Sequence, residues 1–268
     1  MKTLYFDCFS GISGDMTIAA LIDLGVDSEW FLQKMKSLPF LSDEVYLEIA
    51  SDVKKGVKAR TFKVIEKKTA ENHRSYKNIK QLINSTNLKP AISDLAISIF
   101  EHIAIAESKI HNKELDQVHF HEIGAIDSIV DIVGASLLID KLNPEKIVCS
   151  PITLGFGTVK CQHGIYPVPA MATLEILKSV PVLGGQENGE LTTPTGAALV
   201  KSFADCFDKN FYGQFIKHFK HLVNLVLKQN NFLLNNLSLL SSQEYQRIVY
   251  DWNKTEIPYS KDKTIHQL

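Results

Sequence analysis

The sequence predicts a mixed α/β domain over residues 1–205, followed by a mostly helical, loosely packed extension over residues 206–268. In the first part, short apolar runs suited to strands alternate with longer segments of helical period, a pattern typical of mixed α/β folds. That part also holds 13 of the 14 glycines and eight of the nine prolines. The second part is rich in asparagine and carries eight lysines and arginines against five acidic residues, in a chain of net charge −1. We therefore expect a domain boundary near residue 205.

The first half of the expected domain begins with a strand, a glycine loop and a helix. The run TLYFDCF predicts a buried strand, SGISGD a tight loop, and the following segment a helix that ends at Gly25. A second helix is expected over residues 28–38, and the alternating runs EVYLEIA and KARTFKVIE predict a strand pair that turns at Gly56. After a polar connection, SYKNIKQLI and PAISDLAISIFEHIAIAESKI predict two helices, the second opened by Pro90.

The second half continues with a strongly apolar helix after Gly124 and with strands near KIVCSPI. A passage rich in glycine and proline follows, LGFGTVKCQHGIYPVPA. Two further helices are expected to begin at Pro169 and at the segment TPTGAALVKSFAD.

Charge, hydropathy and cysteine usage argue against several classes of protein. A net charge near zero does not indicate the strongly basic surface that would attract nucleic acid or an anionic membrane, so neither is expected as a partner. Asp7 interrupts the N-terminal apolar run, and no later segment reaches the roughly 18 uncharged apolar residues of a spanning helix, so we expect a cytoplasmic protein. The four cysteines stand far apart in the sequence, which argues against a disulfide framework or a zinc ribbon.

The helix after Gly124 places acids in a segment that otherwise suits a protein interior. Its apolar residues cover most of the circumference, which leaves a narrow stripe of Asp127, Asp131 and Gly134 on one face. Like charges at this spacing repel by roughly 0.2–0.5 kcal/mol, and burial of an unpaired carboxylate costs several kcal/mol more. Asp131 should therefore face a partner, which is a lysine, an arginine, backbone donors, a metal ion or a cationic substrate.

Two histidines precede this helix. His119 and His121 lie two residues apart, so on an extended segment both imidazoles point the same way, with Glu122 next in line. Imidazole and carboxylate ligands together suit a divalent first-row metal such as Ni²⁺, Zn²⁺ or Fe²⁺. The competing interpretation is a pair of surface or structural histidines. The neighbouring acidic stripe favours a metal or catalytic role.

The loop DCFSGISGDM is a second candidate site. Its backbone N–H groups and the helix N-terminus that follows favour a phosphate or carboxylate. The motifs of a Walker loop and of a dinucleotide fold are both absent. Two aspartates bracket the loop and could hold a divalent ion beside a phosphate, whereas the structural alternative is a tight turn with Ser13 or Asp15 as the helix cap. The candidate residues are Asp7, Ser10, Gly11, Ser13, Gly14 and Asp15.

Weaker candidates lie elsewhere in the chain. Cys161 and His163, in VKCQHGIYPVPA, are two residues apart and could offer a soft and a borderline ligand together. The alternative for them is a structural loop. His73, in ENHRSYKNI, and the segment GELTTPTGAA carry little signal by themselves.

Five segments, in the order YFDCFSGISGDM, HRSYKNIKQLI, VHFHEIGAIDSIVDIVGA, KCQHGIYPVPA and GELTTPTGAA, resemble the nickel-insertion protein family of lactate-racemase cofactor synthesis (LarC). The resemblance runs from Met1 to about Asp205. It implies that Ni²⁺ is placed into pyridinium-3,5-bisthiocarboxylic acid mononucleotide through carbon–nickel and sulfur–nickel bonds. It also implies that CTP is consumed with Mg²⁺ or Mn²⁺.

The resemblance gives the candidate residues roles. Imidazole and carboxylate ligands load Ni²⁺ and still release it to the substrate's sulfur atoms. Metallation of a ring carbon expels a proton, so a base is needed, and Glu122 or His121 is the candidate. The substrate's phosphate is expected on the loop that ends at Asp15. The candidate nickel ligands are His119, His121, Glu122, Asp127, Asp131, Cys161, His163 and His73.

The chain departs from the family in two ways. Family members often carry a histidine-rich run before the RSYKNI helix, and here only His73 remains. The family also continues for roughly as many residues again, and nucleotide binding is associated with that second half. A separate polypeptide that supplies this half, or self-association, is therefore an expected partner.

Residues 211–268 are similar to the linker between condensation and adenylation domains of nonribosomal peptide synthetases, without the condensation signature. The chain thus looks like a truncated nickel-insertion domain joined to a linker fragment. Three hypotheses stay open: the chain is part of a CTP-dependent cyclometallase, it is a nickel-binding or carrier module without turnover, or it is an inert fusion relic. An unrelated metal hydrolase, with the same acids and histidines activating water, is a more remote fourth.

Overall fold

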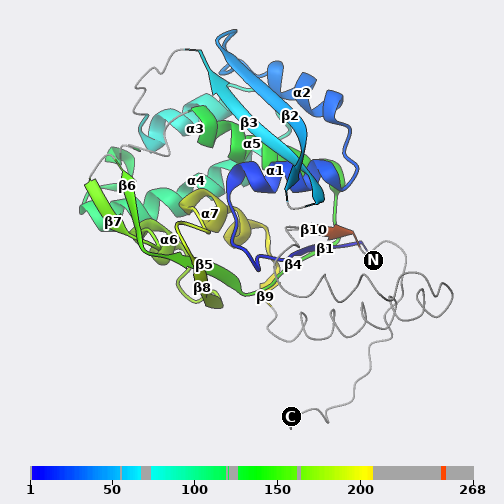
Figure 1. Cartoon of the computed structure of the whole chain (residues 1–268). Helices are drawn as coiled ribbons and strands as arrows, with labels where there is room; N and C mark the ends of the chain where they lie inside the picture. Colours follow the sequence, from blue (N-terminus) through cyan, green and yellow to red (C-terminus); the bar gives the residue numbers. More distant parts are fainter. Residues whose placement is uncertain are drawn as a thin grey trace, which may run out of the picture.

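The computed structural model of the chain describes residues 2–54, 56–67, 74–118, 120, 126–161, 164–207 and 249–251. It confirms a mixed α/β fold (Figure 1). The elements run β1 (Thr3–Phe6), α1 (Gly14–Asp23), α2 (Ser28–Lys36), β2 (Val45–Lys54), β3 (Val57–Glu66), α3 (Tyr76–Asn84), α4 (Pro90–His111), the short 3-10 helix η1 (Leu115–Gln117), α5 (Ile126–Leu142), β4 (Lys146–Cys149), β5 (Ile152–Phe156), β6 (Thr158–Cys161), β7 (Gly164–Pro167), α6 (Met171–Ile176), β8 (Val182–Asn188), α7 (Pro194–Phe203), β9 (Cys206–Phe207) and β10 (Val249–Asp251).

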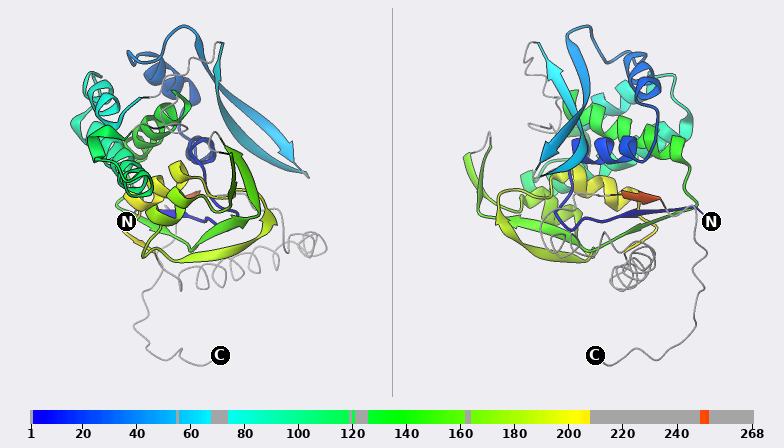
Figure 2. Two further views of the ribbon diagram at one scale, coloured as in Figure 1. Left: turned by 90° about the vertical axis from the view of Figure 1, so that its left-hand side faces the viewer. Right: turned by 45° about the vertical axis from the view of Figure 1, so that its right-hand side comes forward.

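The first strand lies inside a four-stranded sheet of order β10-β1-β4-β9. β1 runs parallel to β4, with Phe6 opposite Cys149, and β4 runs parallel to β9. β10 pairs antiparallel with β1. In both Figure 1 and the right-hand view of Figure 2, α1, α5 and α7 lie on the same side of this sheet. The carboxyl end of β1 therefore leads directly to the helical layer, where the loop to α1 begins.

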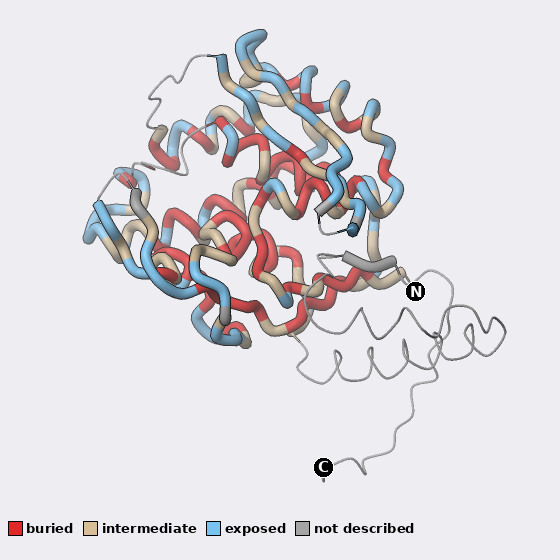
Figure 3. The backbone as a smooth tube through the Cα atoms, viewed as in Figure 1, coloured by how far each residue is buried: buried red, intermediate tan, exposed pale blue. Residues whose placement is uncertain are grey.

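Helix α5 packs against α1, α2, α4 and α7, and most of its residues belong to the buried interior, which is drawn red in Figure 3. Its buried positions surround the helix, as expected from its apolar circumference. Gly134 lets α1 and α2 approach, because a Cβ there would lie 3.0 Å from Cδ1 of Ile18 and 3.1 Å from Cζ of Phe31. The stripe that contains Gly134 thus faces α1, and this orients the two aspartates on the same stripe.

Strands β2 and β3 form an antiparallel ribbon that packs beside α1 (Figure 2). The ribbon turns at Gly56, whose φ of +84° is a conformation that side chains other than glycine rarely adopt. Phe62 of β3 meets Phe31 edge-on at 5.9 Å between ring centroids. This contact packs the ribbon against the core. Glu66, the last residue of β3, lies close enough to Asp127 of α5 for the two charges to interact.

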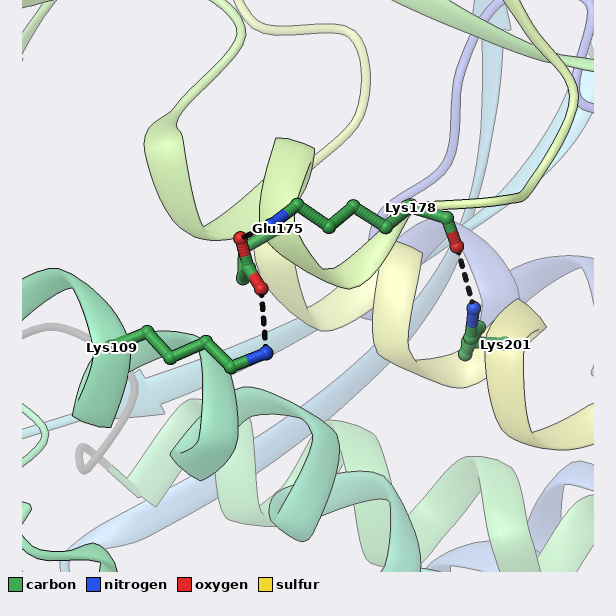
Figure 4. Close-up of polar contacts among 4 residues, drawn as sticks. All are labelled: Lys109, Glu175, Lys178 and Lys201. Carbon is green, nitrogen blue, oxygen red and sulfur yellow. Dashed lines mark hydrogen bonds and ion pairs between the residues drawn. The ribbon is translucent and has the colours of Figure 1, made fainter.

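On the opposite side of α5, ion pairs and a hydrogen bond connect α4, α6 and α7 (Figure 4). Lys109 of α4 lies 2.8 Å from Glu175 of α6, which also pairs with Lys178. Hydrogen bonds from these two lysines lower the pKa of Glu175. Lys201 of α7 donates to the backbone carbonyl of Lys178 at 3.0 Å. The lysine side chains are exposed, so each pair contributes little stability but fixes the short helix α6 in place.

Most elements expected from the sequence are confirmed, and the differences have local causes. The passage rich in glycine and proline folds into the hairpin β6–β7. Strand β8 was not expected, because VLGGQEN lacks the alternation of a half-buried strand, yet it pairs parallel with β5. Beyond residue 205, β9 and β10 both join the sheet, and the rest of the expected helical extension lies outside the described residues. The boundary near residue 205 stays a prediction.

Candidate metal site

The loop between β1 and α1 carries the first part of the site. Ser13 is the N-cap of α1: its hydroxyl accepts a hydrogen bond from the backbone N–H of Met16 and donates to the carboxylate of Asp15. Gly11 has a φ of +83°, and its N–H donates to the carbonyl of Cys8 at 3.0 Å. The structure therefore shows the tight turn, and of the two cap residues that the sequence left open, Ser13 and not Asp15 caps α1. The predicted phosphate site at the same loop stays a prediction.

The loop and the acidic stripe of α5, treated as two sites in the sequence, meet at Gly14. A Cβ on Gly14 would lie 2.3 Å from Oδ2 of Asp131, so only glycine allows the first turn of α1 to come this close to the carboxylate. Asp15 follows at the same helix N-terminus, and Asp127 lies one turn before Asp131 on α5. Three carboxylates from two helices thus share one region of the molecule.

Among the residues that the structure describes, Asp131 lacks a hydrogen-bond donor for one of its two oxygen atoms. Its Oδ1 is buried and accepts no hydrogen bond within the described residues. Burial, followed by the negative charges of Asp15 and Asp127, raises the pKa of Asp131 to about 8. A carboxylate in this position is destabilised unless a proton or another cation neutralises it. The side chain therefore holds a proton near neutral pH unless another cation lies beside it.

Two further acids lie at the edges of this region. Burial raises the pKa of Asp7, at the end of β1, to about 6, although the N–H of Phe9 donates to it at 3.3 Å. Burial and the charge of Asp127 raise the pKa of Glu66, while Arg74 lowers it. Sequence reasoning did not single out Glu66, because the last residue of a solvent-facing ribbon gives no signal of its own.

Residues next to His73 and residues next to His119 lie close together in the fold. The N–H of Phe120 donates to the carbonyl of Arg74, and the N–H of Tyr76 donates to the carbonyl of Val118, both at 3.2 Å. The chain beside His73 and the chain beside His119 therefore run next to each other. Arg74 and Asp127 also both act on Glu66, which places these chain ends near the start of α5.

Several predicted ligands cannot be placed themselves. His73, His119, His121, Glu122 and His163 lie outside the described residues, and Cys161 belongs to β6 with an undescribed side chain. Within the described ranges, no group of three or more His, Cys, Asp and Glu side chains has the geometry to hold a metal ion. The described part of this region thus supplies carboxylates only, and the predicted imidazole ligands stay a prediction.

Two of the cysteines that stand far apart in the sequence come together in the fold. Cys8 and Cys149 are both buried and free, and their sulfur atoms lie 3.7 Å apart. The hydrogen bond with Cys149 and burial raise the pKa of Cys8, which keeps it a thiol. Within the described chain, the pair packs in the core beneath the loop to α1.

Comparison with known proteins decides the family. The chain matches the family described as nickel insertion protein over residues 4–218. It belongs to the nickel insertion protein family. Pyridinium-3,5-bisthiocarboxylic acid mononucleotide nickel insertion proteins of Clostridium kluyveri and Geobacillus kaustophilus are each 46% identical to it over 211 residues, which is 75% of this chain and 53% and 51% of those proteins. A putative nickel insertion protein of Wolinella succinogenes is 48% identical over 208 residues, covering 77% of this chain and 52% of that protein.

Three further findings bear on this member of the nickel insertion protein family. The chain spans about half the length of these curated relatives. No solved structure matches it. Among the described residues, no helix combines the length and apolar character that crossing a bilayer requires.

Proposed function

We propose that this chain binds Ni²⁺ for insertion into pyridinium-3,5-bisthiocarboxylic acid mononucleotide, as the names of its relatives indicate for those proteins. The observation that carries the proposal is Asp131, a largely buried carboxyl group among other acids with no hydrogen bond to its Oδ1 in the described chain. Nickel is the cargo of this reaction. A site that releases its cargo needs ligands that neutralise the ion without enclosing it, and carboxylate and imidazole groups meet this requirement.

In this proposal the acids and the histidines have different tasks. Asp131 and Asp127 attract and hold the ion, and Asp131 loses its proton as nickel binds. His119, His121 and Glu122 complete the ligand set from the adjoining segment, and His73, Cys161 and His163 are further candidate donors. Glu122 or His121 then accepts the proton that leaves the ring carbon when the carbon–nickel bond forms.

The loop to α1 receives the mononucleotide's phosphate in this proposal. The N-terminus of α1 and the loop N–H groups attract an anion, whereas Asp7 and Asp15 repel one. A divalent ion such as Mg²⁺ or Mn²⁺ between the acids and the phosphate removes this conflict. We assign the step that consumes CTP to the second half of the relatives, and a separate polypeptide that carries this half is the proposed partner.

Nickel titration of the purified full chain tests the proposal. We expect one Ni²⁺ per protomer, and loss of saturable binding in the double variant His119→Ala/His121→Ala, because both imidazole ligands are removed. Isothermal titration calorimetry measures both results. His111→Ala is the matched control, since His111 pairs with Glu107 at the end of α4. Wild-type chain without saturable binding would contradict the nickel proposal, and a double variant that binds normally would contradict the ligand assignment.

A carrier module without turnover is the second candidate function, favoured by the half-length match to the relatives. Incubation with Ni²⁺, CTP, Mg²⁺ and the mononucleotide separates the two functions, with mass spectrometry of the small molecule as the measurement. We expect nickel binding without product from this chain alone, and product when the second half is added as a separate polypeptide. Product from this chain alone would instead establish a complete enzyme.

A further inference from the structure

The segment GELTTPTGAA has no role in the proposed nickel site, yet it contacts the loop that presents Asp15. Ile12 and Thr192 form a parallel β-bridge. The N–H of Ile12 donates to the carbonyl of Leu191 at 3.0 Å, and the N–H of Thr193 donates to the carbonyl of Ile12 at 3.1 Å. Both backbone groups of Ile12 are thus held by one short segment from far along the chain.

Two glycines make this contact possible. A Cβ on Gly11 would lie 2.0 Å from the carbonyl oxygen of Leu191, and a Cβ on Gly196 would lie 2.1 Å from the carbonyl oxygen of Ile12. Real Cβ atoms do not approach a neighbour below 3.0 Å. In both cases the neighbour is backbone, which cannot rotate away as a flexible side chain can. A methyl group at either position must therefore move the loop.

The segment that holds Ile12 is itself anchored. Thr193 is the N-cap of α7, and its hydroxyl accepts a hydrogen bond from the N–H of Gly196 at 3.1 Å. The hydroxyl of Thr192 donates to the carbonyl of Thr153 in β5 at 2.8 Å. A displacement at Gly196 is therefore transmitted to the loop and not absorbed by this segment.

The other side of the same loop touches the candidate metal site. Ser13, next to Ile12, caps α1, and Gly14 lies against the carboxylate of Asp131. Only Ser13 lies between Ile12, which the start of α7 holds, and Gly14, which touches the carboxylate of Asp131. The start of α7 thus sets how closely the first turn of α1, with Asp15, approaches Asp131.

We propose that Gly196 and Thr193 are positioning residues for the nickel site: they act through Ile12 to hold Gly14 and Asp15 against Asp131, and they touch neither the metal nor the substrate. The inference rests on the proposed nickel function. Asp131 and the first turn of α1 belong to two different helices, which are not joined by backbone hydrogen bonds as paired strands are. The distance between Asp131 and this turn therefore depends on the segments that hold each helix in place. The contact of α7 with Ile12 provides this support for α1.

The variant Gly196→Ala tests the inference in the full chain. Gly196 lies inside α7, where alanine is the better helix former, so the substitution leaves the helix intact and acts through Ile12. We expect the dissociation constant for Ni²⁺ to rise at least tenfold in calorimetric titration. We also expect the pH midpoint of nickel binding to fall, because Asp131 gains access to water when the loop moves away.

Gly184→Ala is the matched control, since a Cβ on Gly184 meets nothing within 4 Å, and we expect wild-type affinity and an unchanged pH midpoint. Wild-type affinity and midpoint in Gly196→Ala would overturn the inference. Absence of nickel binding in the wild-type chain would instead overturn the proposed function, so the two failures are distinguishable.

A second pair of variants applies if Gly196→Ala does not fold. Thr193→Ala removes the hydroxyl that caps α7, whereas Thr193→Ser keeps it. We expect a severalfold weaker nickel affinity for the alanine variant and restoration by serine. Equal affinities in Thr193→Ala, Thr193→Ser and wild type would overturn the inference.

Discussion

The variant Asp131→Asn is expected to lose nickel binding and, without metal, to unfold less readily than the wild type. Asparagine keeps the shape of the side chain but removes the need either to bind a proton or to bury a charge beside Asp15 and Asp127. At pH 7.5 we expect the free energy of unfolding of the metal-free chain to rise by about 2 kcal/mol, a partial recovery of the cost of a buried carboxylate. Chemical denaturation and nickel titration measure the two effects.

Saturating nickel should reverse this order of stability. A ligand at 100 times its dissociation constant stabilises the folded state by about 2.7 kcal/mol, and only the wild type gains this. Asp94→Asn, on the exposed side of α4, is the matched control and should change neither quantity. An Asp131→Asn variant that binds nickel like the wild type would remove Asp131 from the site.

The stability of the metal-free chain should fall as pH rises from 5 to 8. Because the pKa of Asp131 is raised from 3.8 to about 8 in the folded state, the folded chain holds this proton more tightly than the unfolded chain does. The associated stability is fully present below pH 3.8 and is lost as pH rises through about 8. The expected decrease in the free energy of unfolding between pH 5 and 8 is about 3 kcal/mol.

Denaturant titrations at several pH values, with and without nickel, measure this dependence. Asp7 adds a smaller decrease with the same sign, since its pKa is raised to about 6. Asp131→Asn should remove most of the slope, and Asp94→Asn should retain it. A wild-type profile that is flat or rises over this range would show that Asp131 is already ionised and paired in the metal-free chain.

Helix α5, which contains Asp131, illustrates what can be predicted from the sequence alone. The apolar circumference of α5 and the four-residue spacing of its aspartates are local patterns, and they correctly predict a buried helix with an acidic stripe. The cap of α1 is narrowed in the same way to Ser13 or Asp15, because capping depends on a few adjacent residues, and the structure has Ser13. Local chemistry thus gives most of the element order and the identity of the acids.

What the sequence does not predict depends on contacts between distant segments. The meeting of Gly14 with Asp131 joins two candidate sites that the sequence presents separately, and nothing local to either residue indicates it. The contact of Leu191 and Thr193 with Ile12 is likewise a bridge between distant backbone groups. The pairing of β8 with β5 was missed for the same reason, since its stability comes from its neighbour and not from its own composition.

The position of β1 in the sheet also has a consequence for biosynthesis. β1 is synthesised long before its parallel neighbour β4, which ends at Cys149, and the support of its loop comes later still, at Leu191 and Thr193. Parallel pairing across such a distance forms slowly, because the intervening chain must first be closed into a loop. We therefore expect a nascent chain that stops before residue 190 to lack an ordered approach of Asp15 to Asp131, and the proposed nickel site to form only after α7 has been synthesised and has packed.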